Sequence, residues 1–393
     1  MANINQLPYY LINNTYKTNQ IAKFLLKKVK KLLKEKCPYH YLVFQRKDKM
    51  LKIIQDKSKK YPYFLRFDIE KYYPSINHEI LLDILRKILK SRQGQKLLKT
   101  EILPFLNKIG IQNKGLPLGN YLSYVLAGIY LLPLDIKLIK LNKPFLRVQD
   151  DYLVFCKNKK EPERILKEII SPREMAASPI SRGKPELNKL ELKININKLN
   201  SGKFHQNPVE FMGFRYYAGV FTISEKKIEE FKKKIIKLTY LTKKKPEKAV
   251  IKSLNNQILG FGHYYKFANC KRIYEELDAF VRMRLRRYLS RNKNSKNREG
   301  NLLLTNETLK NLGLKSLLEI KEKYTSKRKH IFGKIAKNKR ETGQKAKSSN
   351  WRELENLELK YQQKLILDEL KQLTTLTKKL EKRIANLERK LDK

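Results

Sequence analysis

Three aspartates, far apart in the sequence, lie at the ends of strand-like runs of apolar residues. Asp68 follows the run 64–67, and the pair Asp150-Asp151 separates the runs 145–148 and 152–155. The second arrangement predicts a β-hairpin with the acidic pair at its turn. Carboxylates brought together repel one another unless a cation neutralises them, and Mg²⁺ prefers oxygen ligands. If both segments meet at one edge of a sheet, the three side chains predict a site for two magnesium ions, which can activate a hydroxyl nucleophile and stabilise a leaving pyrophosphate.

Each segment alone also has an ordinary structural explanation. An aspartate that leaves a strand is often a turn residue or a helix cap, and an Asp-Asp pair can form a solvated hairpin tip. After Asp68 we expect a turn and then a helix that opens at Ser75. Neighbouring strand residues point to opposite faces, so only the first aspartate of the pair is expected to point inward, unless the turn geometry also turns the second.

The composition indicates a folded protein with a polyanionic partner. The chain has 393 residues, 41% of them hydrophobic, and its 88 Lys and Arg against 38 Asp and Glu give a net charge of +50. Such self-repulsion favours nucleic acid as the partner ahead of a membrane surface. We find no run of about 18 apolar residues and no signal-peptide layout at the N-terminus, so we expect a cytoplasmic protein without a membrane span. The scattered Cys37, Cys156 and Cys270 predict neither disulfides nor a zinc module.

Changes in composition divide the chain into five expected parts. These are a basic helical extension (1–60), a mixed strand and helix core (61–222), a helical segment (223–290), a basic linker (291–350) and a heptad segment (351–393). The heptad positions are Ile366, Leu370, Leu373, Thr377, Leu380, Ile384, Leu387 and Leu391. They predict a coiled coil that joins copies of the chain, while a helix packed within its own chain remains the alternative.

Five motifs in order resemble those of reverse transcriptases: FDIEKYYPSI, GLPLGNYLSYVLAGIYL, RVQDDYLVF, LKININK and EFMGF. The resemblance implies an α+β right-hand polymerase with fingers, a palm with an antiparallel sheet, and a helical thumb. It implies two Mg²⁺ ions, with Mn²⁺ as a substitute, held by Asp68, Asp150, Asp151 and the backbone of Ile69. Deoxynucleoside triphosphates would be the substrates, and Tyr73 would be the gate that rejects a ribose 2′-hydroxyl. The alternative for Tyr73 is a core aromatic.

The same resemblance assigns further contacts. Pro117, Leu118, Gly119 and Lys198 would lie near the incoming nucleotide, and Gln149 with the 211–214 hairpin would touch the primer or template. That hairpin is Phe211, Met212, Gly213 and Phe214. Without the neighbouring motifs, Gly115–Gly119 would be a turn before a buried helix, and Lys198 is assigned by position only. Val148, Leu118 and Tyr124 depart from the residues common in relatives, which affects nucleotide contacts, fidelity and template preference rather than the metal site.

The segment 254–269 and the helix that follows it resemble the maturase-associated thumb of group II intron enzymes and their bacterial offshoots. In such a thumb Arg282, Arg286 and Arg287 would contact phosphates of the template–primer duplex, where a solvated basic face is the alternative. An apolar stripe with Ile273, Leu277, Val281 and Leu285 predicts the buried face of that helix. His263 fits packing better than ligation.

No cysteine and histidine cluster marks an endonuclease module, so a stand-alone bacterial enzyme fits better than a mobile-intron maturase. Relatives of that kind, in retrons, diversity generation or phage defence, commonly work with a structured non-coding RNA, which the basic segments 291–301 and 325–350 would bind. Two other functions stay open. One is template-independent or protein-primed DNA synthesis. The other is a non-catalytic RNA-binding maturase or scaffold, against which the intact set of three aspartates argues.

Overall fold

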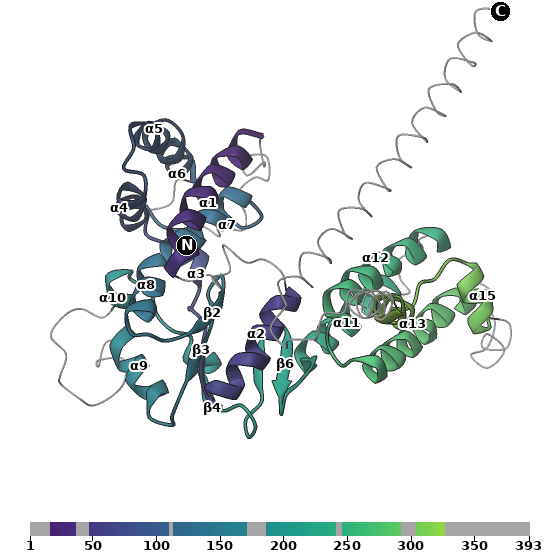
Figure 1. Cartoon of the computed structure of the whole chain (residues 1–393). Helices are drawn as coiled ribbons and strands as arrows, with labels where there is room; N and C mark the ends of the chain where they lie inside the picture. The colour runs from purple at the N-terminus through teal and green to yellow at the C-terminus, as the bar shows by residue number, and fades with distance from the viewer. Residues whose placement is uncertain are drawn as a thin grey trace, which may run out of the picture. The chain divides into compact units, whose positions relative to one another are not determined.

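The computed structural model describes residues 16–36, 47–109, 113–170, 186–240, 246–291 and 304–326 (Figure 1). The described residues form two compact units that divide after Leu238, with Phe267–Cys270 belonging to the first. The predicted loop 171–184, most of both basic segments and the whole heptad segment lie outside the described residues. The coiled coil and the assembly expected from it therefore stay predictions.

An antiparallel sheet of four strands organises the first unit. Its strands are β1 (Tyr63–Phe67), β2 (Phe145–Val148), β3 (Asp151–Cys156) and β4 (Asn200–Lys203), in the order β2-β3-β1-β4. Phe67 lies opposite Tyr152, and Val148 lies opposite Asp151. This register brings the end of β1 beside the start of β3, so the residues after Phe67 and before Tyr152 share one edge of the sheet.

Both faces of this sheet are covered, which explains why β1, β2 and β3 are nearly continuous apolar runs. Leu65, Phe67 and Val154 pack into the main core, and on the opposite face Phe64 and Phe155 contact the ring of Phe204. The short helices α9 (Glu161–Ile169) and α10 (Glu186–Lys189) lie beside the sheet, and α9 contacts β1. Both predicted strands around the acidic pair are confirmed as a hairpin.

Helices α7 (Tyr121–Tyr130) and α8 (Leu132–Lys140) lead into the hairpin, and α7 is almost wholly buried. Although no uninterrupted apolar run was expected, the segment Tyr121–Lys140 is long and apolar enough to cross a membrane, with 72% of it buried inside the protein. A core helix of a soluble protein meets the same criterion, and this burial is what a core helix requires.

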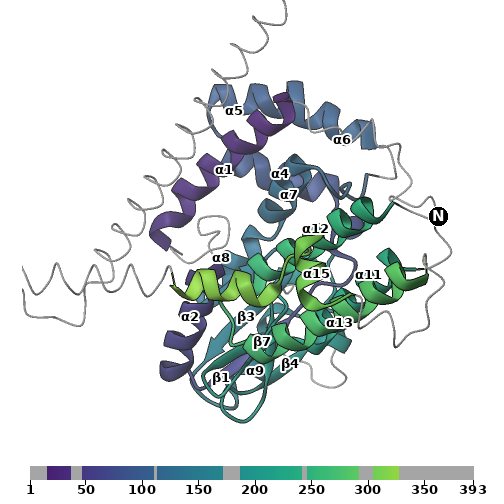
Figure 2. The same cartoon turned by 90° about the vertical axis from the view of Figure 1, so that its right-hand side faces the viewer.

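A group of helices gathers beyond one end of the sheet in both views (Figures 1 and 2). Its members are α1 (Tyr16–Lys36), α4 (His78–Ile88), α5 (Arg92–Leu97), the π-helical turn η3 (Leu98–Ile102) and α6 (Leu103–Ile109). The basic extension is helical as expected, its residues Ile21, Leu25 and Val29 are buried, and α1 packs against α7. Asn77 caps α4 by accepting the N–H groups of Glu79 and Ile80, so the helix does not open at Ser75 as expected. Ser75 instead ends the single turn α3 (Tyr72–Ser75).

A second sheet completes the first unit, with strands β5 (Val209–Phe211), β6 (Phe214–Tyr217) and β7 (Val220–Ile223) in that order. Helix α2 (Lys47–Lys60) joins it, because Ser58 Oγ lies 2.8 Å from the Tyr216 hydroxyl. The Phe204 ring also contacts Tyr216, with ring centroids 5.7 Å apart. Helix α11 (Glu225–Leu238) follows β7.

The second unit is helical, as expected for most of the segment 223–290. It contains α12 (Glu247–Tyr265), α13 (Lys271–Arg291), α15 (Asn306–Asn311) and a helix over 317–326. The apolar stripe of α13 is buried at Leu277, Val281 and Leu285. Asp278 caps the last helix by accepting bonds from Ser316 Oγ at 2.6 Å and from the Leu317 amide at 2.8 Å.

Candidate active site at one edge of the four-stranded sheet

Asp68 and Asp150 come together at the edge that the sheet register predicts. Asp68 directly follows β1 and is only 7% exposed, and Asp150 occupies the two-residue turn between β2 and β3. Their carboxyl groups lie within hydrogen-bonding reach of one another. Burial, and then the neighbouring charge of Asp68, raise the pKa of Asp150 to about 6. Neighbouring carboxyl groups favour binding of a cation, which is what a metal site requires.

Asp151 takes a different direction, because it is the first residue of β3 and points to the neighbouring strand. Arg66 of β1 holds it with two parallel bonds, Nε to Oδ1 at 3.1 Å and Nη2 to Oδ2 at 3.3 Å. Burial raises the pKa of Asp151 to about 6, although Arg66 favours the charged form. The two aspartates of the pair thus have different partners, as expected for neighbouring strand residues.

The side chains suit a divalent cation only in part. Within the described ranges, no group of three or more His, Cys, Asp or Glu side chains is arranged to hold a metal ion. Asp68 and Asp150 supply paired hard oxygens, the donor set that Mg²⁺ prefers. Asp151 would join them only by exchanging its bonds to Arg66. Two protein cations, Arg66 and Lys198, thus neutralise the carboxylates that an incoming cation would otherwise neutralise.

Lys198 lies next to Asp68, which its position in the sequence alone could not show. It ends the short 3₁₀ helix η4 (Ile196–Lys198), and its Nζ lies 2.6 Å from Asp68 Oδ2. The side chain is 48% exposed, so it can reach both the carboxylate and solvent. A mobile cation in this place could pass from Asp68 to a phosphate group.

The backbone beside Ile69 is fixed by the segment before η4. Asn195 donates its N–H to the Asp68 carbonyl at 2.8 Å, and Glu70 donates to the Lys193 carbonyl at 2.8 Å. These bonds flank Ile69, which pairs with Ile194 in an isolated antiparallel bridge. The pairing uses groups of Asp68 and Glu70 and does not use the carbonyl of Ile69 itself.

Tyr73 lies in α3, next to Asp150. Burial raises the pKa of its phenol well above the ordinary value, and the neighbouring Tyr124 and Asp150 raise it further. The Tyr73 carbonyl accepts the Leu116 amide at 3.0 Å. The segment 115–119 therefore lies next to Tyr73. Within it Pro117 is buried, Leu118 is 57% exposed, and Gly119 has φ 84° with nothing within 4 Å of a Cβ placed there.

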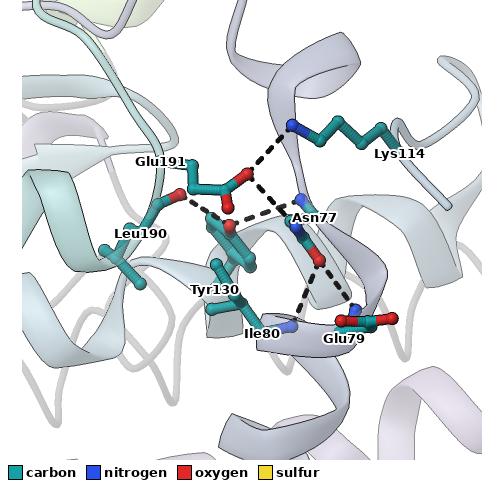
Figure 3. Close-up of polar contacts among 7 residues, drawn as sticks. All are labelled: Asn77, Glu79, Ile80, Lys114, Tyr130, Leu190 and Glu191. Atoms are coloured by element: carbon teal, nitrogen blue, oxygen red, sulfur yellow. Dashed lines mark hydrogen bonds and ion pairs between the residues drawn. The ribbon is translucent and has the colours of Figure 1, made fainter. Parts of the chain in front are cut away.

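A polar cluster fixes the start of α4 against this segment (Figure 3). Glu191 accepts a bond from Asn77 Nδ2 at 3.2 Å and one from Lys114 Nζ at 2.9 Å. The Tyr130 hydroxyl donates to the Leu190 carbonyl at 2.7 Å and accepts from the Asn77 amide. The start of α4, Lys114, the end of α7 and the residues Leu190 and Glu191 are thereby held together.

Three charged residues at this edge were not singled out by sequence reasoning: Arg66, Asp135 and Arg147. Arg147 and Asp135 form an ion pair whose two side chains are 0% exposed. Arg147 Nη1 also donates to the Gln149 carbonyl at 2.9 Å, in the turn that carries Asp150. An arginine inside the apolar run 145–148 was the available signal, because a charge within a buried strand requires a partner.

In the hairpin 211–214 the turn is more exposed than the two aromatic rings. Phe211 and Phe214 are 2% and 1% exposed, while Met212 and Gly213 form the turn with φ 56° and 76°. Two central residues with positive φ are typical of a tight type I′ hairpin. A nucleic acid could touch only the turn, through Met212 and the Gly213 backbone.

The arginines of α13 have different surroundings within the second unit. Arg286 donates to the Leu304 carbonyl at 2.6 Å and to Asn306 Oδ1 at 2.7 Å, so it joins α13 to Leu304 and to the first residue of α15. Arg282 is half-buried and Arg287 is exposed. Arg287 and Arg282 therefore retain groups for an external phosphate, whereas Arg286 serves mainly within the fold.

Comparison with known proteins gives two family matches. A sequence model described as reverse transcriptase (RNA-dependent DNA polymerase) matches residues 11–216, and one described as the group II intron maturase-specific domain matches residues 228–303. No protein in the curated set matches the chain.

Solved structures with similar coordinates include two telomerases. Apo telomerase from Candida tropicalis is 14% identical over 72% of this chain and 51% of its own, with a TM-score of 0.43. Telomerase from Candida albicans, bound to a fragment of telomeric RNA, is 13% identical over 77% of this chain and 55% of its own, with a TM-score of 0.39. The chain spans about half the length of these telomerases.

Proposed function

The chain belongs to the reverse transcriptase family, whose model covers more than half of it, and we propose that this RNA-directed DNA polymerase extends a 3′-hydroxyl at the edge formed by Asp68 and Asp150. The maturase-specific match over residues 228–303 indicates a group II intron-like reverse transcriptase. One observation carries the assignment of the site. Asp68 and Asp150 come from separate strands, yet their carboxyl groups meet where the family requires acidic residues.

Members of this family generally use divalent metal ions, and we assign their binding to Asp68, Asp150 and Asp151, with the Ile69 carbonyl as a further oxygen. When bound, such ions lower the pKa of the attacking hydroxyl and stabilise the leaving pyrophosphate. We propose two Mg²⁺ ions, with Mn²⁺ as a substitute. The bonds from Arg66 to Asp151 must break before all three carboxylates can bind metal. Arg66 therefore controls whether Asp151 is available as a ligand.

The side chains around the carboxylates would select and orient the nucleotide. Lys198 would exchange its bond to Asp68 for one to the triphosphate, which keeps its charge paired in both states. The Tyr73 ring next to Asp150 would fill the space that a ribose 2′-hydroxyl needs. Pro117, Leu118 and Gly119 would support the base, because their segment is bonded to the Tyr73 carbonyl.

We assign the template–primer to two turns of the first unit. Gln149, Met212 and Gly213, all half-buried, would contact the primer strand, with Phe211 and Phe214 holding the second turn from inside. In the second unit, Arg282 and Arg287 would bind phosphates, with Arg286 as their support. The net charge of +50 supports a large polyanion such as a structured RNA as the template.

Primer extension by the purified protein tests the function. The protein is mixed with Mg²⁺, a labelled DNA primer on an RNA template, and deoxynucleotides, beside an Asp150→Asn variant. We expect extension by the wild type, none by the variant, and loss of extension after RNase treatment of the template. Synthesis that survives RNase would instead favour untemplated activity, and equal inactivity of both proteins would favour the scaffold.

A further inference from the structure

One ion pair in the first unit is completely enclosed, and the proposed function does not account for it. Arg147 lies in β2 and Asp135 in α8, and Nε and Oδ1 are 2.8 Å apart. Neither side chain is exposed. A buried ion pair is on average no more stabilising than apolar residues of similar volume. The fold alone therefore gives little reason for this pair.

Arg147 also donates to α7 and to the turn after β2. Nη2 donates to the Gly128 carbonyl of α7 at 3.1 Å, and Nη1 donates to the Gln149 carbonyl at 2.9 Å. The Gln149 carbonyl belongs to the peptide group that leads directly into Asp150. The guanidinium thus fixes the plane of that peptide relative to α7 and α8, because a planar fork leaves little rotational freedom.

The turn needs such support. Gln149 has φ 57°, a conformation that glycine adopts freely and other residues adopt at a cost. It is the first of two central residues in the turn, and Asp150 is the second. Gln149 is strained and is held in place directly before Asp150. This points to a role in orienting Asp150 toward Asp68.

Tyr152 connects the ion pair to the other aspartates. Its hydroxyl donates to Asp135 Oδ1 at 2.8 Å, and its ring stacks on Phe67 with centroids 4.7 Å apart. Phe67 directly precedes Asp68, and Tyr152 directly follows Asp151. The enclosed cluster therefore contacts the chain beside each of the three carboxylates.

We propose that Arg147, with Asp135 as its counter-ion, is a positioning residue that aims Asp150 at Asp68. The inference rests on the proposed function, since nucleotide transfer is the step that depends on this alignment. Arg147 acts through the Gln149 carbonyl and touches neither substrate nor reacting atoms.

The test removes both charges together. The variant Asp135→Leu/Arg147→Met replaces the pair by apolar residues of similar size, which such sites usually tolerate. A single substitution would leave a buried charge without its partner and would report on folding instead. Tyr152→Phe is the matched control, because it removes a bond to Asp135 and leaves the bond from Arg147 to Gln149.

We expect the double variant to keep its circular dichroism and melting temperature while kcat falls by about 100-fold. The KM for deoxynucleotides and the Kd for template–primer should change little. Its affinity for Mn²⁺, measured by electron paramagnetic resonance without substrate, should fall as well. Tyr152→Phe should stay close to the wild type in kcat. In a Gln149→Gly background the same double substitution should lower kcat much less, because glycine adopts the turn without support.

A folded double variant with wild-type kcat and Mn²⁺ affinity would overturn the proposal, as would an equal loss in Tyr152→Phe. If the double variant does not fold, Arg147→Lys keeps the charge beside Asp135 but cannot also hold the Gln149 carbonyl, and kcat should still fall. If the wild type shows no more activity than Asp68→Asn, the proposed function fails. The Mn²⁺ affinity of the double variant then still decides whether Arg147 aims Asp150 at Asp68.

Discussion

Asp135 and Asp150 lie in the same unit but have opposite surroundings. Asp135 is fully buried and is held by Arg147 and by the Tyr152 hydroxyl. Asp150 faces a second carboxyl group, and burial together with that neighbour raises its pKa to about 6. The difference separates a carboxylate that is closed to external ions from one that is open to them. A carboxylate whose partners are all supplied by the protein has no place for a metal ion, whereas one that the fold leaves under-compensated is available to an external cation.

The largest contrast should appear when each aspartate loses its charge in turn. Asp150→Asn should lower nucleotide incorporation by about 1,000-fold or more, since roughly 4 kcal/mol of transition-state stabilisation depends on that carboxylate. The metal-free variant should nevertheless fold at least as stably as the wild type, because an electrostatic repulsion is removed. Primer extension and urea unfolding measure the two effects. Substantial activity in Asp150→Asn would contradict the assignment of Asp150 to catalysis.

Asp135→Asn should show the reverse pattern in stability. The substitution leaves Arg147 buried beside a neutral amide and should cost about 3 kcal/mol of unfolding free energy. Urea unfolding at pH 7 measures it, with Asp83→Asn as the control, because Asp83 lies in an exposed ion pair with Arg86. An Asp135→Asn protein as stable as the control would mean that the enclosed pair does not hold the fold.

Tyr73 and Tyr152 extend the comparison to two aromatic neighbours of the two aspartates. Tyr73→Ala should raise the use of ribonucleotides relative to deoxynucleotides by about 100-fold, because the space for a 2′-hydroxyl opens. Tyr73→Phe keeps the ring and should keep the selectivity. Single-nucleotide incorporation gives kcat/KM for each substrate. Unchanged selectivity in Tyr73→Ala would return Tyr73 to the role of a core aromatic.

The raised pKa of Asp150 also predicts a pH dependence of stability without metal. The folded state binds a proton more tightly than the unfolded chain, whose carboxyl has a pKa of 3.8. Stability is therefore highest below pH 3.8 for this group and falls by roughly 3 kcal/mol in total as the pH rises through about 6. Urea unfolding in EDTA at pH 5 and pH 7 should show about 1 kcal/mol of this fall, and Asp150→Asn should reduce it. An identical fall in both proteins would assign the effect to other groups.

The smallest effects should separate the arginines of α13. Arg287→Ala should weaken duplex binding a few-fold. It should also lower the slope of log Kd against the logarithm of the salt concentration by about one. Arg286→Ala should instead lower the melting temperature, because its bonds to Leu304 and Asn306 are lost. Fluorescence anisotropy at several salt concentrations measures binding, and calorimetry measures stability. Equal salt slopes for Arg287→Ala and the wild type would exclude a phosphate contact.

The sequence predicted the hairpin around Asp150, strand β1, helix α7 and the apolar face of α13, since each has a strong local pattern of apolar residues and turns. It placed the opening of α4 wrongly at Ser75, because two hydroxyl or amide residues stand within three positions and only the contacts of Asn77 with Glu191 and Tyr130 distinguish them. The ordered motifs indicated the family, and residues 11–216 matched it.

The sequence by itself determined which residues could carry charge to a metal and in which order their strands follow. Local periodicity and side-chain chemistry are written in neighbouring residues, so they can be read directly. Tertiary structure alone decided that Arg66 holds Asp151, that Lys198 holds Asp68, and that Arg147 is enclosed with Asp135 behind the turn. Ion pairing and burial depend on which distant segments the fold brings within a few ångströms, and no local pattern encodes that distance.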